Sequence, residues 1–378
     1  MPRNERAIIR MNVIFAAPPC EVFVSTFFKR QCYTGLLCLS LLSVMQAGCG
    51  KNQPMSANIP RLMESAHVIK SSGKILGMSF SPGNDRLMFG TSNGIVEIWQ
   101  LTNAPKKIDA IDVQMQISCI AIAKDWSRFC VGSFDGKITV WNLQTKSTNT
   151  ISLEQSDPIN VLAFSPDSLS LSAGTIGRAP SLYLLDAKRK SPLCSTHCGR
   201  NAIYGLSYSD SGAFLAVSGG DDTIRILNAQ SLFVERKWVA SESKVLEGIT
   251  SIAYEKNASG RLISGDAEGR VCLWNKTNNT YERMFKAISG PISSIVLDSS
   301  GTFLAICGGE LSTEEAWFTL FRLDTFEPVT TLAGHTGSIN TLAMSNDGRI
   351  LATGGRDADS SVRLWLCGEY LAKIGWLR

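Results

Sequence analysis

The sequence predicts an all-β protein that is built from repeats of one short unit. The unit is clearest at residues 334–366, where three short apolar runs occupy residues 339–345, 350–354 and 362–366. Gly, Asp and Asn separate these runs, and such residues form the tight turns that join antiparallel strands. The unit is therefore expected to fold as three antiparallel strands.

The same pattern recurs along most of the chain. Each unit ends near a large apolar residue, which we call its anchor; the last anchor is Trp365, and the six upstream anchors are Trp99, Trp141, Leu185, Leu227, Trp274 and Phe321. By subtraction, successive anchors are 42, 44, 42, 47, 47 and 44 residues apart. One unit alone does not bury both faces of its sheet, so neighbouring units are expected to stack. The repeat therefore predicts one closed domain, although the length alone would suggest two or three.

The ends of the last unit carry a resemblance to a known family. Gly334 and His335 open this unit, and Trp365 closes its third run. In these features the sequence resembles the WD-repeat (β-transducin-like) family, whose unit of about 40–45 residues forms one propeller blade. Leu366 differs, because the family has Asp there. The resemblance covers roughly residues 75–366 and implies a seven-bladed β-propeller of four-stranded antiparallel blades.

The resemblance also implies a hydrogen-bonded structural tetrad in the last unit, formed by His335, Thr353, Asp359 and Trp365. The other six units lack the histidine. Several of them keep an acidic residue six positions before the anchor, at Asp135, Asp221 and Glu268. A buried carboxylate must be hydrogen-bonded, so these residues are expected to bond to turn amides alone. The propeller is accordingly expected to be irregular, most of all in its third and sixth units.

Two segments fit the fourth strand of the last blade, which would close the ring. Residues 67–70 precede the first unit at the spacing of an outer strand, and residues 370–374 follow the last anchor at a similar spacing. An open ring would expose sheet edges, so one segment must fill this position. We favour residues 67–70, with residues 370–374 packing at the edge or alongside.

The leading part of the chain does not fit the repeat. Residues 31–50 carry no charge, follow Lys29 and Arg30, and contain an apolar run at residues 33–45. With the small residues before Cys49, this pattern resembles a bacterial lipoprotein signal, which implies cleavage before Cys49 and lipid attachment to its thiol. We expect a signal region at residues 1–48, a tether at residues 49–65 and the propeller at residues 66–378. The alternatives are another cleaved export signal, an uncleaved membrane anchor or a segment unrelated to export.

The composition argues against several classes of partner. The net charge is +4, and residues 1–48 supply +3 of it, so the body of the chain is nearly neutral. Nucleic acid needs a concentrated basic face and is not an expected partner. The 11 cysteines are scattered, which argues against an oxidising compartment, although Cys119 and Cys130 could face each other across paired strands. The Cys194, His197 and Cys198 cluster has too few ligands for a structural zinc site, and a disulfide or two free thiols is expected there. No metal or cofactor is predicted.

No catalytic residues are predicted either. Gly90, Ser92 and Gly94 match the G-x-S-x-G pattern of hydrolases, but they fall between two expected strands of a blade, where they form a turn. Propellers of this family commonly bind proteins or peptides at the loops that lead into the inner strands. The candidate residues in these loops are Lys74, Gln116, Asp157, Asn201, Glu247, Pro291 and Ser338.

The sequence therefore predicts a non-catalytic scaffold that binds a protein or peptide. We expect it to be a monomer, held on the membrane of a bacterial cell envelope by its N-terminal lipid or anchor. One alternative is a hydrolase-type enzyme with a site at the mouth of the central channel, which would require carboxylates or histidines with perturbed pKa values. The other alternative is a cytoplasmic scaffold of the same fold.

Overall fold

The computed structural model describes residues 61–368, with gaps at 154–155, 190–191, 240–247, 256–259, 276–279, 310–316, 333 and 357–358. The chain divides into two units, Met1–Ala57 and Asn58–Arg378, and all described residues lie in the second. The predicted signal region, Cys49 and the alternative closing segment at residues 370–374 lie outside the described residues.

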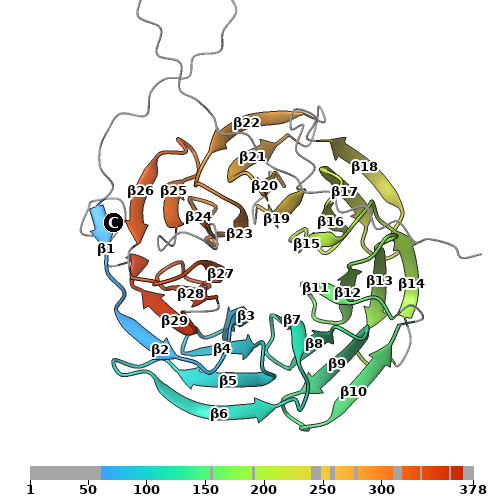
Figure 1. Ribbon diagram of the computed structural model, residues 1–378, viewed down its shortest axis with the longest axis horizontal. Helices are drawn as coiled ribbons and strands as arrows, with labels where there is room; N and C mark the ends of the chain where they lie inside the picture. The colour runs from blue at the N-terminus through green and yellow to red at the C-terminus, as the bar shows by residue number, and fades with distance from the viewer. Residues whose placement is uncertain are drawn as a thin grey trace, which may run out of the picture. The chain divides into compact units, whose positions relative to one another are not determined.

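The second unit is a ring of seven antiparallel blades, as predicted (Figure 1). Blade 1 consists of β3 (Ile75–Phe80), β4 (Arg86–Thr91), β5 (Ile95–Gln100) and β6 (Lys106–Asp112). Blade 2 consists of β7 (Ile117–Ile122), β8 (Arg128–Ser133), β9 (Lys137–Asn142) and β10 (Thr148–Ser152). Blade 3 consists of β11 (Ile159–Phe164), β12 (Ser170–Thr175), β13 (Ser181–Asp186) and β14 (Pro192–His197). Blade 4 consists of β15 (Ile203–Tyr208), β16 (Phe214–Gly219), β17 (Thr223–Asn228) and β18 (Val234–Val239).

The remaining blades follow the same order, from the inner strand near the ring axis to the outer strand at the rim. Blade 5 consists of β19 (Ile249–Tyr254), β20 (Leu262–Asp266), β21 (Arg270–Trp274) and β22 (Tyr281–Lys286). Blade 6 consists of β23 (Ile292–Leu297), β24 (Phe303–Gly308), β25 (Trp317–Arg322) and β26 (Pro328–Leu332), with β1 (Arg61–Met63) as a fifth strand. Blade 7 consists of β27 (Ile339–Met344), β28 (Leu351–Gly355) and β29 (Ser361–Trp365), with β2 (His67–Lys70) as its outer strand.

The seven anchors all lie on the third strand of their blades. Trp99 is on β5 and Trp365 on β29, and the other five occupy β9, β13, β17, β21 and β25. The predicted register of the repeat is therefore confirmed. It follows from local signals, because each blade repeats the same order of apolar runs and turn residues.

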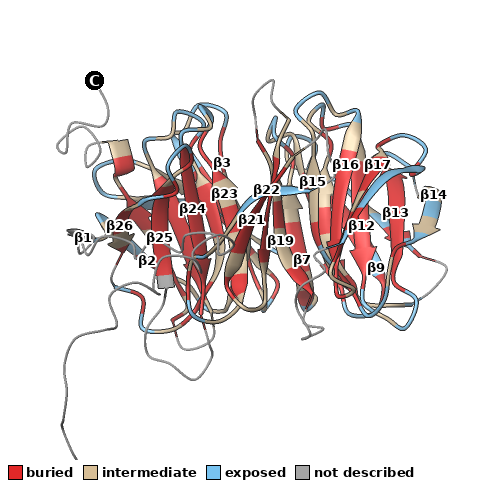
Figure 2. Cartoon of the chain, turned by 90° about the horizontal axis from the view of Figure 1, so that it is seen from above, coloured by how far each residue is buried: buried red, intermediate tan, exposed pale blue. Residues whose placement is uncertain are grey.

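The core of the ring lies between neighbouring blades. β24 shows this most clearly, since every one of its residues is buried. Phe318 of blade 6 stacks on Trp365 of blade 7 with ring centroids 6.5 Å apart, and Trp238 of blade 4 stacks on Trp274 of blade 5 at 5.6 Å. Figure 2 shows buried residues through the strands and exposed ones mainly in the connections and outer strands. Each blade thus completes the core of the next.

The ring closes through the segment that precedes the first blade. β2 pairs antiparallel with β29, from His67 opposite Leu364 to Lys70 opposite Ser361. The preference for residues 67–70 over the C-terminal alternative is confirmed. The fifth strand β1, which pairs parallel with β26, was not anticipated, because residues up to 65 were expected to form a tether. Met63, 8% exposed, packs into the core between blades 6 and 7 and accounts for this extra strand.

Candidate functional site

The four tetrad residues form one hydrogen-bonded chain in blade 7. His335 Nδ1 lies 2.7 Å from Asp359 Oδ2, and its Nε2 lies 2.6 Å from Thr353 Oγ1. Trp365 Nε1 donates to the same Thr353 oxygen at 3.0 Å. Because a carboxylate only accepts, His335 donates from Nδ1, and Thr353 donates its hydroxyl proton to Nε2. Burial of Asp359 opposes ionisation, but the hydrogen bonds from His335 and Ser361 hold the pKa of its carboxyl well below the usual range.

The acidic residues of blades 2, 4 and 5 are not held by turn amides alone, so that expectation was wrong. Asp135 accepts from Ser133 Oγ and pairs with Lys137 Nζ at 2.6 Å. Asp221 forms a two-point ion pair with Arg225 of β17, at 3.1 and 2.5 Å. The physical reason is that a cationic side chain from the third strand supplies the partner that the missing histidine would have provided.

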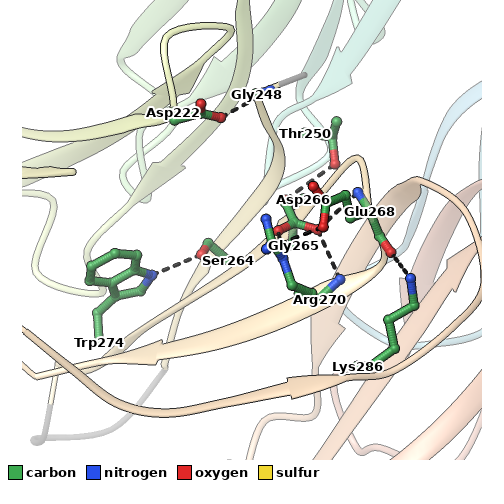
Figure 3. Close-up of polar contacts among 10 residues, drawn as sticks. All are labelled: Asp222, Gly248, Thr250, Ser264, Gly265, Asp266, Glu268, Arg270, Trp274 and Lys286. Carbon is green, nitrogen blue, oxygen red and sulfur yellow. Dashed lines mark hydrogen bonds and ion pairs between the residues drawn. The ribbon is translucent and has the colours of Figure 1, made fainter. Parts of the chain in front are cut away.

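In blade 5 the turn amides bond to Asp266 and not to the predicted Glu268, which lies two positions later (Figure 3). Asp266 accepts from the main-chain N–H of Glu268 at 3.0 Å and of Arg270 at 2.8 Å, and from Arg270 Nε at 2.6 Å. Among the described residues, the partner of the Glu268 carboxylate is Arg270, at 3.2 Å. Trp274 donates from Nε1 to Ser264 Oγ at 2.8 Å, much as Trp365 does to Thr353. Charge pairing thus replaces the histidine network in this blade.

Antiparallel strands place the connections of each blade alternately on two faces of the ring. The upper face, as we call it, carries the loops that lead into the inner strands and the turns between second and third strands. Two predicted loop residues, Lys74 and Gln116, come together there around a pocket of about 420 Å³ between blades 1 and 2. Leu76, Ile117 and Phe134 supply its apolar walls, and the remaining lining residues are polar, namely Ser92, Asn93 and Ser118.

The other predicted loop residues do not join this pocket. The Asp157 carboxylate packs against the backbone of Gly177, whose N–H donates to the Asn201 carbonyl at 2.9 Å. Ser338 is only 8% exposed, because it packs beside the second turn of blade 7, so it is not a surface contact residue. Pro291 approaches Gly308 through its carbonyl oxygen. Glu247 lies outside the described residues.

Three exposed apolar side chains on the upper face were missed by sequence reasoning. Phe134, Ile176 and Tyr204 are 62%, 40% and 36% exposed and belong to consecutive blades, 2, 3 and 4. Phe134 and Ile176 occupy turns between second and third strands, where polar residues are typical. That placement is the one signal that could have identified them.

No described residues assemble an obvious catalytic centre. Ser92 of the G-x-S-x-G pattern lies in the turn between β4 and β5, while His67, His197 and His335 belong to other blades. At the blade 4–5 junction, Asp222 accepts from Gly248 N–H at 3.1 Å (Figure 3). Burial, with the nearby charges of Asp221 and Asp266, raises the pKa of Asp222. Asp221 and Asp266 are each paired with an arginine. The three carboxylates at this junction therefore have partners within the protein and hold the blades together.

The cysteines show no metal-like arrangement in the described parts of the chain. Cys194 is half-buried on β14, Cys198 is buried, and His197 Nδ1 lies 3.0 Å from Ser181 Oγ. No group of three or more Cys, His, Asp or Glu is placed to hold a metal among these residues. Cys119 pairs with Gly132 and Cys130 with Ala121, so these two thiols are not directly opposite; both are free.

The described residues include no helix that is both long enough and apolar enough to cross a membrane.

The chain is similar to repeat proteins of known family. The family model for the WD domain, G-beta repeat, matches residues 190–228 and 326–365. The B-type cell cycle switch protein ccs52A of Medicago truncatula is 24% identical over 274 residues, which are 71% of this chain and 55% of that protein. The target of rapamycin complex subunit wat1 of Schizosaccharomyces pombe is 25% identical over 236 residues, 61% of this chain and 72% of that protein.

Rat apoptotic protease-activating factor 1 is 23% identical over 323 residues, which are 76% of this chain and 25% of that protein. The chain thus spans about half the length of the Medicago relative and a quarter of the rat one. Both matched segments run from an outer strand through the third strand of the next blade, β14 to β17 and β26 to β29. The ring, the anchors and these matches together support a WD-repeat β-propeller.

Proposed function

We propose that this protein is a non-catalytic scaffold that docks a segment of a partner protein on its upper face. The observation that carries the proposal is the pocket between blades 1 and 2, which contains two of the predicted loop residues and the exposed Phe134. WD-repeat propellers generally bind proteins, and one similar protein is named as the subunit of a complex.

The chemistry of the pocket suits a peptide. Leu76, Ile117 and Phe134 offer an apolar floor and wall for one side chain. The amide of Gln116 can bond to main-chain groups of an extended peptide. The amide of Asn93 is already bonded to Thr91 and Ser72, so it fixes the polar edge of the pocket. Exposed aromatic residues next to a pocket are typical anchors of protein interfaces. Because the blades hold these groups in place before binding, little ordering free energy is lost on association.

Site-specific photo-crosslinking tests this proposal. A benzophenone amino acid is placed at position 134 or 176 of the full chain in its native host, and at position 169 as a control. Leu169 is a matched control because it is also apolar and is 57% exposed. It lies in the first turn of blade 3, on the opposite face. The proposal expects one shared protein adduct from positions 134 and 176 and its absence from position 169. Adducts that are equal from all three positions would overturn it.

We further propose that Cys49 carries a lipid that holds the scaffold on a bacterial membrane. The support is the uncharged segment after Lys29 and Arg30 and the small residues before Cys49. Intact mass and membrane fractionation of the wild type and the Cys49→Ser variant test it. A membrane-bound form that starts at Cys49 with added lipid mass, lost in the variant, is expected. A soluble wild-type chain that keeps its N-terminus would contradict the proposal and favour the cytoplasmic alternative.

A further inference from the structure

On the upper face, the loop that leads from blade 3 into blade 4 pairs with the second turn of blade 3. Two main-chain hydrogen bonds and one isolated antiparallel bridge join these segments. They are Cys198 N–H to the Pro180 carbonyl at 3.0 Å, Gly177 N–H to the Asn201 carbonyl at 2.9 Å, and the bridge between Ile176 and Ala202. All three contacts keep the register of the β13–β14 ladder, in which Ser181 lies opposite His197. The two segments therefore continue the pairing of blade 3 across its upper face.

This register places Arg178 opposite Arg200. Both arginines lie between the two main-chain bonds, so their backbones are held in place on either side. The Ala202 N–H also donates to the Arg200 carbonyl at 3.0 Å, and Asn201 has a left-handed backbone with φ of 70°. Residues that lie opposite each other in an antiparallel pair are nearest neighbours across it. Two guanidinium-bearing side chains therefore start from adjacent points on the surface.

The two arginines are exposed, and neither forms an ion pair with a residue in the described part of the chain. The acid of the next blade's second turn, Asp221, is bound at two points by Arg225. Like charges that lie opposite each other in a paired segment repel and destabilise it. An anion bound between Arg178 and Arg200 would relieve this repulsion, whereas a cation or an apolar group would not.

We propose, on the basis of the docking function proposed above, that Arg178 and Arg200 together bind the carboxylate of an Asp or Glu side chain in the partner segment. A guanidinium group presents paired N–H donors that match the two oxygens of a carboxylate. With one guanidinium on each side, a single carboxylate meets two positive charges. The docking segment is thereby expected to be acidic at the point where it crosses from blade 3 to blade 4.

An apolar contact lies next to the arginine pair. Ile176 is 40% exposed and stands two residues before Arg178. Its N–H donates to the Pro158 carbonyl at 3.0 Å, and its bridge to Ala202 fixes it on the other side. A segment with a leucine close to its acidic residue would therefore cover Ile176 while its carboxylate reaches the arginines.

The surrounding acids favour a carboxylate over a phosphate group. The Asp157 carboxylate packs against Gly177, the residue before Arg178, and the Asp221 carboxylate packs against Gly199, the residue before Arg200. Both would repel an anion, and the repulsion grows with the charge of that anion. A phosphate group carries close to two negative charges at neutral pH, whereas a carboxylate carries one. The arginine pair therefore suits the smaller charge.

Isothermal titration of the full-length protein with short capped peptides tests the chemistry. The peptides share one Gly/Ser-flanked sequence with a leucine and differ at one nearby position, which holds Glu, Gln, Lys or phosphoserine. The Glu peptide should bind about fivefold more tightly than the Gln peptide, and the Lys peptide more weakly than either. Equal binding of the Glu and Gln peptides, or no binding of the Glu peptide, would overturn the proposal. Tighter binding of the phosphoserine peptide than of the Glu peptide would overturn the choice of a carboxylate.

Charge variants of the protein locate the site. If one carboxylate contacts both arginines, Arg178→Gln or Arg200→Gln alone should remove most of the preference for Glu over Gln, and the double variant should add little. The control, Lys124→Gln with Lys188→Gln, removes two exposed cations from turns of the opposite face and should keep the preference. Melting temperatures check the fold and should not fall, because both arginines are exposed. An equal loss in the control would show non-specific attraction and contradict the site.

The photo-crosslinking experiment separates the arginine pair from the docking function on which it rests. A shared adduct from positions 134 and 176, together with equal binding of the Glu and Gln peptides, would contradict the role of the arginine pair alone. A preference for Glu that depends on both arginines, without a shared adduct, would support the carboxylate site and contradict the docking function.

Discussion

The side-chain amide of Asn340 donates from Nδ2 to the main-chain carbonyl of Ile75 at 2.7 Å, and this bond joins the last blade to the first. Three other junctions repeat it: Ser118 Oγ donates to the carbonyl of Ile159, Asn160 Nδ2 to that of Ile203, and Thr250 Oγ1 to that of Ile292, at 2.5, 2.7 and 2.6 Å. Each donor is the second residue of an inner strand, where a bulge follows a buried isoleucine. The bulge turns this residue toward the next blade.

Removal of the Asn340 side chain should loosen the junction that closes the ring. Asn340→Ala leaves the Ile75 carbonyl without this donor, and the free energy of unfolding should fall by about 1–2 kcal/mol. Urea denaturation measures the change. Asn149→Ala is the control, because the Asn149 amide makes an exposed bond to the Arg189 carbonyl, and its effect should stay within about 0.5 kcal/mol. Losses of the same size in both variants would argue against a role for the junction.

The stability of blade 7 should depend on pH through Asp359. Its folded-state pKa is lowered by the hydrogen bonds of the tetrad, which outweigh burial. A lowered pKa gives stability that is complete above the unfolded value of about 3.9 and is lost as the pH falls below it. Urea denaturation at about pH 7 and pH 3 should show that Asp359→Asn is much less stable than the wild type at neutral pH, with a smaller difference in acid. A difference that does not change with pH would contradict this account.

The closing strand β2 offers a matched pair of substitutions. Ile69 is 3% exposed and belongs to the core between blades 7 and 1, whereas the adjacent Val68 is 48% exposed. Ile69→Ala should lower the free energy of unfolding by about 2–4 kcal/mol, since it opens a cavity at the closure of the ring. Val68→Ala should change it by less than about 0.5 kcal/mol. Similar values for the two variants would mean that β2 is not packed as the structure shows.

The seven described cysteines should differ sharply in reactivity. Burial raises the pKa of Cys119, Cys272 and Cys367 to about 12 and that of Cys198 to about 11, so these thiols hold little thiolate. Cys194 is half-buried, and its pKa is raised less. Brief alkylation of the native protein, followed by peptide mapping, should label Cys194 first among these seven. Early labelling of Cys119 or Cys307 would show that the blades open readily.

Much of the fold follows from local sequence patterns. The Gly, Asp and Asn turns and the apolar runs place all seven anchors on third strands. The spacing before Ile75 made residues 67–70 one of two candidates for the closing strand, and the pairing of β2 with β29 decides between them. The three residues of β1 are too few to show a period, so their pairing with β26 depends on tertiary contacts of Met63. No local signal distinguishes such a segment from a tether.

The ion pairs and loop contacts around the blade turns were less predictable, because the residues that form each contact come from different strands or turns. Arg225 and Arg270 replace the histidine from positions that the repeat does not mark, so the ion pairs with Asp221 and Asp266 emerge only when β17 and β21 are folded. Ser338 was placed correctly in its loop, but its burial depends on the neighbouring turn. Lys74 and Gln116, in contrast, meet in one pocket because equivalent loops of adjacent blades are neighbours in any such ring.

The most direct test of docking on the upper face uses the partner that crosslinking identifies. Its binding affinity is measured for three forms of the full chain. These are the wild type, Phe134→Ser and the opposite-face control Leu169→Ser. Phe134→Ser should weaken binding at least about tenfold, since removal of an interface anchor loses roughly 1.4 kcal/mol or more, and Leu169→Ser should match the wild type. Unchanged affinity in Phe134→Ser, or an equal loss in Leu169→Ser, would contradict the proposed docking face.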